Sequence, residues 1–257
     1  MIFEDLKIWF HQGKQYIPDV TTVEVPGIFR GRPIITTAPV DENALATLCP
    51  LGAIGKSPVS IDLGRCSFCG ECTLAFPHKI SFTKDYKLSA NIRNGLVIKE
   101  GDNQPITLDA KAIRKEIHQL FNGSLKLRQV CAGGDGSTEW ELGAAGNVNF
   151  DMGRFGIEFV ASPRHADGLV ITGPITESIS EPLRMAYEAT PEPKIIILAG
   201  TDAISGGIFE GSQALNRSFL ETRHIDLYIP GNPVHPLTFI NGVLSLIRTK
   251  TRQRSLD

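Results

Sequence analysis

Closely spaced cysteines in the first third constrain this chain more than any other feature. Cys66, Cys69 and Cys72 are three residues apart in the sequence RCSFCGEC, and Cys49 stands upstream, directly before Pro50. Three thiolates on one tight loop can bind three irons of an iron–sulfur cubane. The chain has five cysteines, an odd number, so a metal site explains them better than a disulfide framework does.

The cysteines that are missing follow a pattern. In two-cluster ferredoxins each motif reads C-x2-C-x2-C-x3-C-P, and its fourth cysteine ligates the other cluster. Here Phe76 occupies the fourth position of the second motif, and only the Cys49-Pro50 end of a first motif is present. One cluster would therefore lack every ligand, whereas the other would keep all of its ligands. We predict one 4Fe–4S cluster, bound by Cys49, Cys66, Cys69 and Cys72.

Zinc is the alternative occupant of these four cysteines, because four thiolates can also bind one zinc ion tetrahedrally. Zinc ribbons usually supply two separated C-x2-C pairs. A triple run combined with a Cys-Pro pair is instead the iron–sulfur pattern, which favours the cluster.

Composition argues against several other classes of protein. The chain has 257 residues and a net charge of -2, which gives no electrostatic reason to expect nucleic acid as a partner. No apolar run approaches the roughly 20 residues that span a bilayer. The start, MIFEDLKIWFHQGKQ, lacks a basic region followed by an apolar one, so we predict no secretory signal and a cytoplasmic location.

A change in character near residue 105 indicates two domains, 1–105 and 106–257. The sequence GDNQP, ending at Pro105, is typical of a turn or linker. Helical spacing of apolar residues then predicts a helix over Leu108–Phe121.

The second half alternates short apolar runs with segments of helical character. This alternation predicts a parallel sheet covered on both faces, with any site at the carboxyl ends of its strands. The predicted strands are Gly156–Val160, Gly168–Thr172, Lys194–Ala199 and Ile225–Ile229. The predicted helices are Thr176–Ala189, Gly211–Thr222 and Pro236–Arg248, and a further helix should start near Ser137 or Thr138, capped by one of them.

The first third resembles the two-cluster ferredoxin-like subunit of formate hydrogenlyase and the related subunit of respiratory complex I. The resemblance implies a ferredoxin-like α+β iron–sulfur domain. It rests on the segments FRGRP (29–33), CPLGAI (49–54), IDLGRCSFCGEC (61–72) and FTKDYKL (82–88).

From about Arg128 to Ile247 the chain resembles the small electron-transfer subunit shared by NiFe hydrogenases of the formate hydrogenlyase type and complex I. The segments that carry this resemblance are RFGI (154–157), SPRHAD (162–167), TGPIT (172–176), GTDA (200–203), GGIF (206–209) and YIPGNP (228–233). The resemblance implies a flavodoxin-like α/β fold whose loops hold a proximal 4Fe–4S cluster against a large catalytic subunit.

The four cysteines that hold the proximal cluster in that family fall on Cys131, Gly134, Asp202 and Asn232. Three thiolates are therefore missing. We expect no conventional cluster at these positions, and we expect Cys131 to be a small buried residue.

The two resemblances together predict an α/β protein that is an iron–sulfur subunit of a membrane-associated complex related to formate hydrogenlyase, energy-converting hydrogenases and complex I. Its predicted partners are a large-subunit homologue and membrane subunits, not nucleic acid, on the cytoplasmic side of the inner membrane. We expect no catalytic residues of its own. One alternative is an electron-transfer small subunit of a working hydrogenase or quinone oxidoreductase; another is a scaffold or redox-sensing module.

Overall fold

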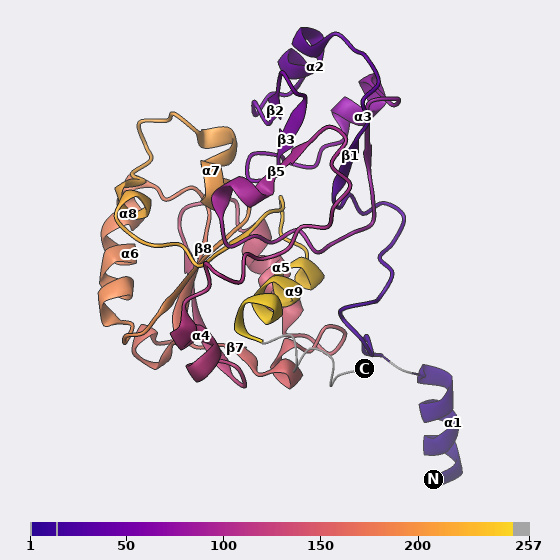
Figure 1. The fold of residues 1–257 in the computed structure, drawn as a ribbon. Helices are drawn as coiled ribbons and strands as arrows, with labels where there is room; N and C mark the ends of the chain where they lie inside the picture. The colour runs from indigo at the N-terminus through magenta and orange to yellow at the C-terminus, as the bar shows by residue number, and fades with distance from the viewer. Residues whose placement is uncertain (1, 14, 249–257) are drawn as a thin grey trace.

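Five parallel strands form the sheet that organises the second half of the chain. The structure, a computed structural model, describes residues 2–13 and 15–248 (Figure 1). The strands lie in the order β10-β9-β8-β6-β7, and each adjacent pair is parallel. Their bounds are β6 Leu125–Cys131, β7 Ile157–Phe159, β8 Gly168–Thr172, β9 Ile195–Ala199 and β10 Leu227–Ile229.

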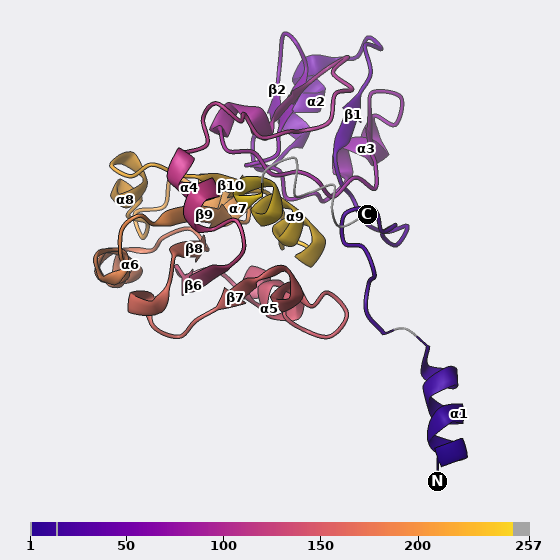
Figure 2. The same ribbon diagram turned by 60° about the horizontal axis from the view of Figure 1, so that its bottom comes forward.

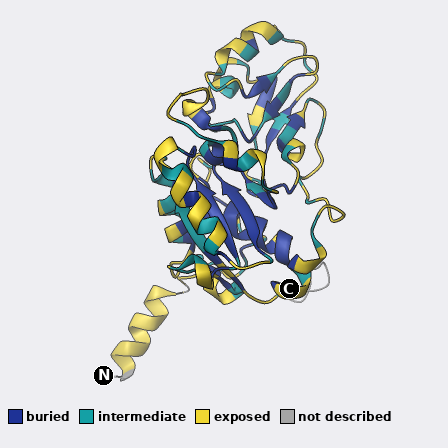
Figure 3. Cartoon of the chain, turned by 90° about the vertical axis from the view of Figure 1, so that its left-hand side faces the viewer, coloured by how far each residue is buried: buried dark blue, intermediate teal, exposed yellow. Residues whose placement is uncertain are grey.

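Side chains on both faces of this sheet are buried. In β9, Ile195 and Ile197 belong to one apolar cluster, whereas Ile196 and Leu198 between them belong to another. Successive residues of a strand point to opposite faces, so a continuous apolar run requires cover on both. Figure 3 shows the result as dark blue strands between helices with exposed outer surfaces.

Helices supply that cover on the two faces. Buried residues of α4 (Lys115–Leu120), α5 (Ser137–Ala145) and α9 (Pro236–Ile247) join the first apolar cluster. The second cluster takes residues from the helices on the opposite face, which are α6 (Glu177–Ala189), α7 (Thr201–Ser205) and α8 (Ser218–Glu221). Short 3-10 helices are η1 Arg93–Leu96, η2 Met152–Phe155, η3 Pro163–His165 and η4 Gly207–Phe209.

The first hundred residues form two small antiparallel sheets. One pairs β1 (Pro33–Ile35) with β4 (Ile80–Phe82). The other has the order β2-β3-β5, with bounds Ile54–Gly55, Ser60–Asp62 and Val97–Lys99. Two short helices, α2 (Glu42–Leu48) and α3 (Glu71–Ala75), lie beside them.

The first helix, α1 (Ile2–Gln12), stands apart from the rest of the chain in Figures 1 and 2. Its apolar side chains Phe3, Trp9 and Phe10 are all exposed. No helix within residues 2–13 and 15–248 is long and apolar enough to cross a membrane.

Backbone and side-chain contacts join the two halves. Ala90 exchanges two hydrogen bonds with Tyr228 of β10, with N···O distances of 3.1 and 2.8 Å. Val20 presents its carbonyl to the Asn241 amide of α9 at 2.8 Å. The second apolar cluster also contains residues from both halves, so it forms a continuous core across the junction.

All four strands predicted from apolar runs are confirmed as β7, β8, β9 and β10. The predicted helices Thr176–Ala189 and Pro236–Arg248 correspond to α6 and α9. A helix does start at Ser137, but its cap is Gly136, which has no side-chain hydrogen bond, so the predicted hydroxyl cap is wrong.

Two predicted helices are wrong over most of their length. Only Lys115–Leu120 of the segment 108–121 is helical, because Asp109 exchanges hydrogen bonds with Asn91 and starts a turn. Only Ser218–Glu221 of the segment 211–222 is helical, because backbone groups at 214–216 bond to residues 175–177 instead. The sequence interpretation also missed β6, which lies between β7 and β8.

Leu127 of β6 tests how much the fold depends on this sheet. Its side chain is 0% exposed, and truncation leaves a cavity between the sheet and its covering helices. We expect Leu127→Ala to lower the free energy of unfolding by about 2–5 kcal/mol. Lys126→Ala, at the exposed neighbouring position, should change it by less than about 0.5 kcal/mol. Equal losses in urea denaturation of the two variants would contradict this view of the core.

Candidate metal centre

Four cysteines from three segments of the chain line one pocket. Cys49 caps the carboxyl end of α2, Cys66 and Cys69 lie in the loop after β3, and Cys72 lies in the first turn of α3. Thus the structure brings together the four residues that the spacing predicts as ligands. The rest of the lining is largely apolar and includes Leu48, Pro50, Ala53, Ile54, Ile61 and Phe82.

Backbone conformation turns N–H groups toward two of the sulfurs. The N–H of Ala53 donates to Cys49 Sγ, and that of Phe68 donates to Cys66 Sγ, both at 3.3 Å. These contacts depend on tight turns in which Gly52, Phe68 and Gly70 adopt positive φ angles of 57°, 56° and 85°. Phe68 is notable because such a conformation is uncommon for a bulky residue. N–H groups directed at sulfur stabilise its thiolate form.

The surroundings of Cys66 and Cys72 disfavour a free thiolate. Burial raises the pKa of Cys66 to about 12, and burial together with the Cys69 thiol raises that of Cys72. Without metal these thiols are therefore protonated at neutral pH. Metal binding must release their protons, which makes the affinity of such a site rise with pH.

The donor set fits an iron–sulfur cubane, which takes four cysteine thiolates. Among the residues that the structure describes, no three His, Cys, Asp or Glu side chains converge as the ligands of a single ion would. A cubane needs no such convergence, because each thiolate binds a different iron.

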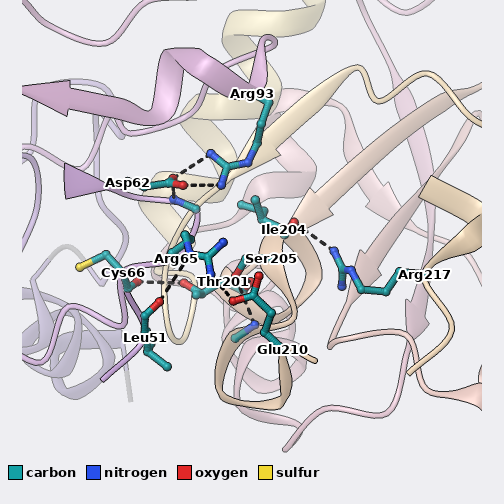
Figure 4. A network of polar contacts seen from close by, with 12 residues as sticks. Leu51, Asp62, Arg65, Cys66, Arg93, Thr201, Ile204, Ser205, Glu210 and Arg217 are labelled. Carbon is teal, nitrogen blue, oxygen red and sulfur yellow. Dashed lines mark hydrogen bonds and ion pairs between the residues drawn. The ribbon is translucent and has the colours of Figure 1, made fainter. Parts of the chain in front are cut away.

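The Cys66 loop is attached to the carboxyl edge of the parallel sheet. Thr201, in the first turn of α7, donates its hydroxyl to the Cys66 carbonyl at 2.9 Å, as Figure 4 shows. An ion pair between Arg65 and Glu210 closes the same junction. Arg93 pairs with Asp62 through two hydrogen bonds of 2.7 and 2.6 Å, which fixes the turn before the loop.

The second set of candidate positions lies at the carboxyl ends of the parallel strands. Gly134, Asp202 and Asn232 line one small cavity, together with the carboxylates of Asp135 and Glu139. These positions follow β6, β9 and β10, so they meet at the carboxyl ends of the strands, where the sequence predicts any site of this half.

Cys131 corrects one expectation, because it is exposed rather than buried. It is the last residue of β6, and it is exposed although its register partner Thr172 on β8 is buried. Partial burial raises its pKa, as does a hydrogen bond to Glu139. Glu139 also accepts a hydrogen bond of 2.6 Å from the Thr172 hydroxyl.

This second set does not fit a 4Fe–4S cluster. Only one of the four residues has a thiol, Gly134 has no side chain, and Asn232 is a neutral amide. A Cβ at Gly134 would lie 3.0 Å from the Cα of Gly173, so the backbone leaves little room for a cysteine.

The comparisons with known proteins agree with the fold of the second half. Residues 131–246 match the family described as NADH ubiquinone oxidoreductase, 20 Kd subunit. The probable membrane-bound hydrogenase subunit mbhJ of Pyrococcus furiosus is 36% identical over 139 residues, which cover 53% of this chain and 83% of that protein. The chain belongs to this family. Its members typically bind a 4Fe–4S cluster.

Two further relatives are matched over a smaller share of their length. Formate hydrogenlyase subunit 7 of Escherichia coli is 34% identical over 155 residues, covering 58% of this chain and 61% of that protein. An NADH-quinone oxidoreductase subunit of Citrifermentans bemidjiense is 39% identical over 106 residues, covering 41% and 62%. The relatives are thus subunits of hydrogenase and complex I assemblies, and the chain spans about three fifths of these two.

Sequence reasoning missed two residues that act on the cysteine loop. Thr201 lies in the segment GTDA and Arg30 in FRGRP, and both segments serve in the sequence only as marks of resemblance. A hydroxyl next to a strand end, as at Thr201, and an exposed cation next to a glycine, as at Arg30, are weak sequence signals of a functional contact. Their contacts depend on long-range packing, with Thr201 reaching a carbonyl 135 residues away.

Asp202 gives a test of the electrostatics at the second set of positions. Burial raises the pKa of Asp202 above its ordinary value of 3.8, and the Asp135 and Glu139 carboxylates raise it further. A carboxyl whose pKa is raised by folding destabilises the fold at pH values above that pKa and has no such effect below the unfolded value. We therefore expect Asp202→Asn to increase the free energy of unfolding at pH 7. The increase should shrink as the pH falls toward about 4. A difference that does not change with pH would contradict this account.

Proposed function

We propose that the chain is an iron–sulfur subunit of a membrane-associated complex related to formate hydrogenlyase, energy-converting hydrogenases and complex I. It would carry one 4Fe–4S cluster on Cys49, Cys66, Cys69 and Cys72. The observation that carries the proposal is the agreement between ligand pattern and geometry. The four cysteines that one cluster needs are all present, and all four line a single pocket.

We further propose a ferredoxin-like domain over 1–105 and a flavodoxin-like domain over 106–257. Support for the first comes from two antiparallel sheets beside two short helices, of which α2 ends at Cys49 and α3 contains Cys72. Support for the second comes from strand order. Numbered along the chain from β6, the sheet has the order 2-1-3-4-5, which is the flavodoxin-like order.

Within this proposal each part of the cysteine pocket has a defined task. A bound 4Fe–4S cluster supplies one-electron redox chemistry. The four thiolates bind it, the N–H groups of Ala53 and Phe68 stabilise two of them, and the apolar lining limits access of water. The hydroxyl of Thr201 orients the Cys66 segment against the second half.

The second half would act in assembly instead of binding a proximal cluster. Its loops keep the segments that resemble the family, but Gly134, Asp202 and Asn232 stand where thiolates are needed. The second half therefore lacks the ligands for a cluster that could pass electrons to a large subunit.

The proposed partners are a large-subunit homologue and membrane subunits, which would hold the chain on the cytoplasmic side of the inner membrane. Exposed apolar side chains support this proposal. Trp140 is 83% exposed on α5 and lies close to Gly136, beside the second set of positions. A large exposed aromatic side chain is a common anchor of protein interfaces.

Ligand assignment gives a direct test. Anaerobically purified protein should contain about four irons and four sulfides per chain, because only one complete cysteine set exists. Serine at position 49, 66, 69 or 72 should lower the iron content or convert the cluster. Cys131→Ser is the matched control and should keep both iron content and visible absorption. One zinc per chain without that absorption would support the zinc alternative, and about eight irons would refute the loss of the other sites.

Partner binding and hydrogen chemistry give a second test. We expect the chain to co-purify with a large-subunit homologue, and Trp140→Ala to reduce its recovery by about tenfold. Leu120→Ala, which changes an exposed apolar residue at the opposite edge of the sheet, should leave recovery unchanged.

The intact complex should neither evolve nor consume hydrogen. Robust hydrogen turnover would instead establish the alternative of a functional hydrogenase subunit.

A further inference from the structure

Arg30 is held at a fixed place beside the cysteine loop. On its carboxyl side, the N–H of Gly31 donates to Thr83 at 2.8 Å and that of Arg32 donates to Asp85 at 3.0 Å. A Cβ on Gly31 would lie 2.0 Å from the Asp85 carbonyl oxygen, so only glycine permits this close approach. The backbone on which Arg30 stands is therefore anchored to the strand segment after β4.

The Arg30 guanidinium lies against the loop that carries Cys66, Cys69 and Cys72. Its Nη1 donates to the carbonyl of Phe68 at 3.2 Å. Its Nε stands 2.8 Å from the place of a Cβ on Gly70, a residue with positive φ. Gly70 thus leaves the space that the guanidinium occupies.

The contact with Phe68 bears on the loop's conformation. Phe68 has a φ of 56°, and its N–H donates to Cys66 Sγ. A bulky residue with positive φ is strained, so a hydrogen bond to its carbonyl helps to hold it there. Arg30 therefore supports the turn that directs this N–H at sulfur.

The charge of Arg30 is also uncompensated. Across residues 2–13 and 15–248 no carboxylate forms an ion pair with it, whereas Arg65, directly before Cys66, pairs with Glu210. Glu71, in the first turn of α3, lines the cysteine pocket and carries a charge opposite to that of Arg30.

We propose that Arg30 is a positioning residue of the cysteine loop whose charge raises the reduction potential of the cluster bound there. The inference rests on the proposed 4Fe–4S cluster. Reduction adds one negative charge to a group already ligated by four thiolates, and a nearby cation favours the more negative state. The same argument gives Glu71 the opposite effect.

The experiment compares four variants with wild type by redox titration of the cluster, followed by electron paramagnetic resonance. Arg30→Gln should lower the equilibrium constant for reduction by up to about tenfold, which is a shift of about 59 mV for one electron. Arg30→Lys should restore most of the potential because it keeps the charge. Glu71→Gln should shift the potential upward. Arg164→Gln, at the far edge of the sheet, should have no effect.

Iron and sulfide content separates the two proposals. Wild-type protein without iron would overturn the proposed function and this inference with it. A full cluster with equal potentials in wild type, Arg30→Gln and Glu71→Gln would overturn the inference alone. If Arg30→Gln fails to assemble a cluster while Arg30→Lys succeeds, the positioning role is supported. An unchanged potential in Glu71→Gln would then refute the role of charge.

Discussion

The hydrogen bond from Thr201 to the Cys66 carbonyl ties the cysteine loop directly to the carboxyl edge of the parallel sheet. Thr201 is 1% exposed and begins α7, directly after the fully buried strand β9. Its N–H donates to the Gly231 carbonyl, so one residue connects the cysteine loop, the sheet and the loop after β10. A displacement of the Cys66 loop would therefore strain hydrogen bonds at the carboxyl edge of the sheet.

Polar side chains lie at this edge because both faces of the sheet are apolar. Helices cover both sides, and polar side chains are left to gather where the strands end. In strand order, the change of direction falls between β6 and β8, which are neighbours in the sheet but not in the chain. Cys131 and Thr172 end these two strands in register, and the Glu139 carboxylate contacts both residues. The Cys131 thiol, the Thr172 hydroxyl and the Glu139 carboxylate therefore meet at the point where the strand order reverses.

Sequence alone predicted the parts of the structure that local patterns determine. Apolar runs identified the strands from β7 to β10, and cysteine spacing identified the four thiols that share a pocket. It failed at β6, where Lys126 and Arg128 alternate with apolar residues and hide a central strand. It failed again at 211–222, where backbone pairing with residues 175–177 replaces a helix. The contacts of Arg30 and Thr201 join residues 38 and 135 positions apart, which no local pattern encodes.

The two candidate sites differ in how the backbone treats them. Around the cysteine loop, positive φ angles at Gly52, Phe68 and Gly70 keep the turns open and direct N–H groups at sulfur. At the second set, Gly134 packs so closely on Gly173 that a Cβ would meet its Cα at 3.0 Å. Placing a thiolate at position 134 therefore requires the loop after β8 to move as well. A cysteine at position 134 would therefore face a steric cost that the four-cysteine pocket does not impose.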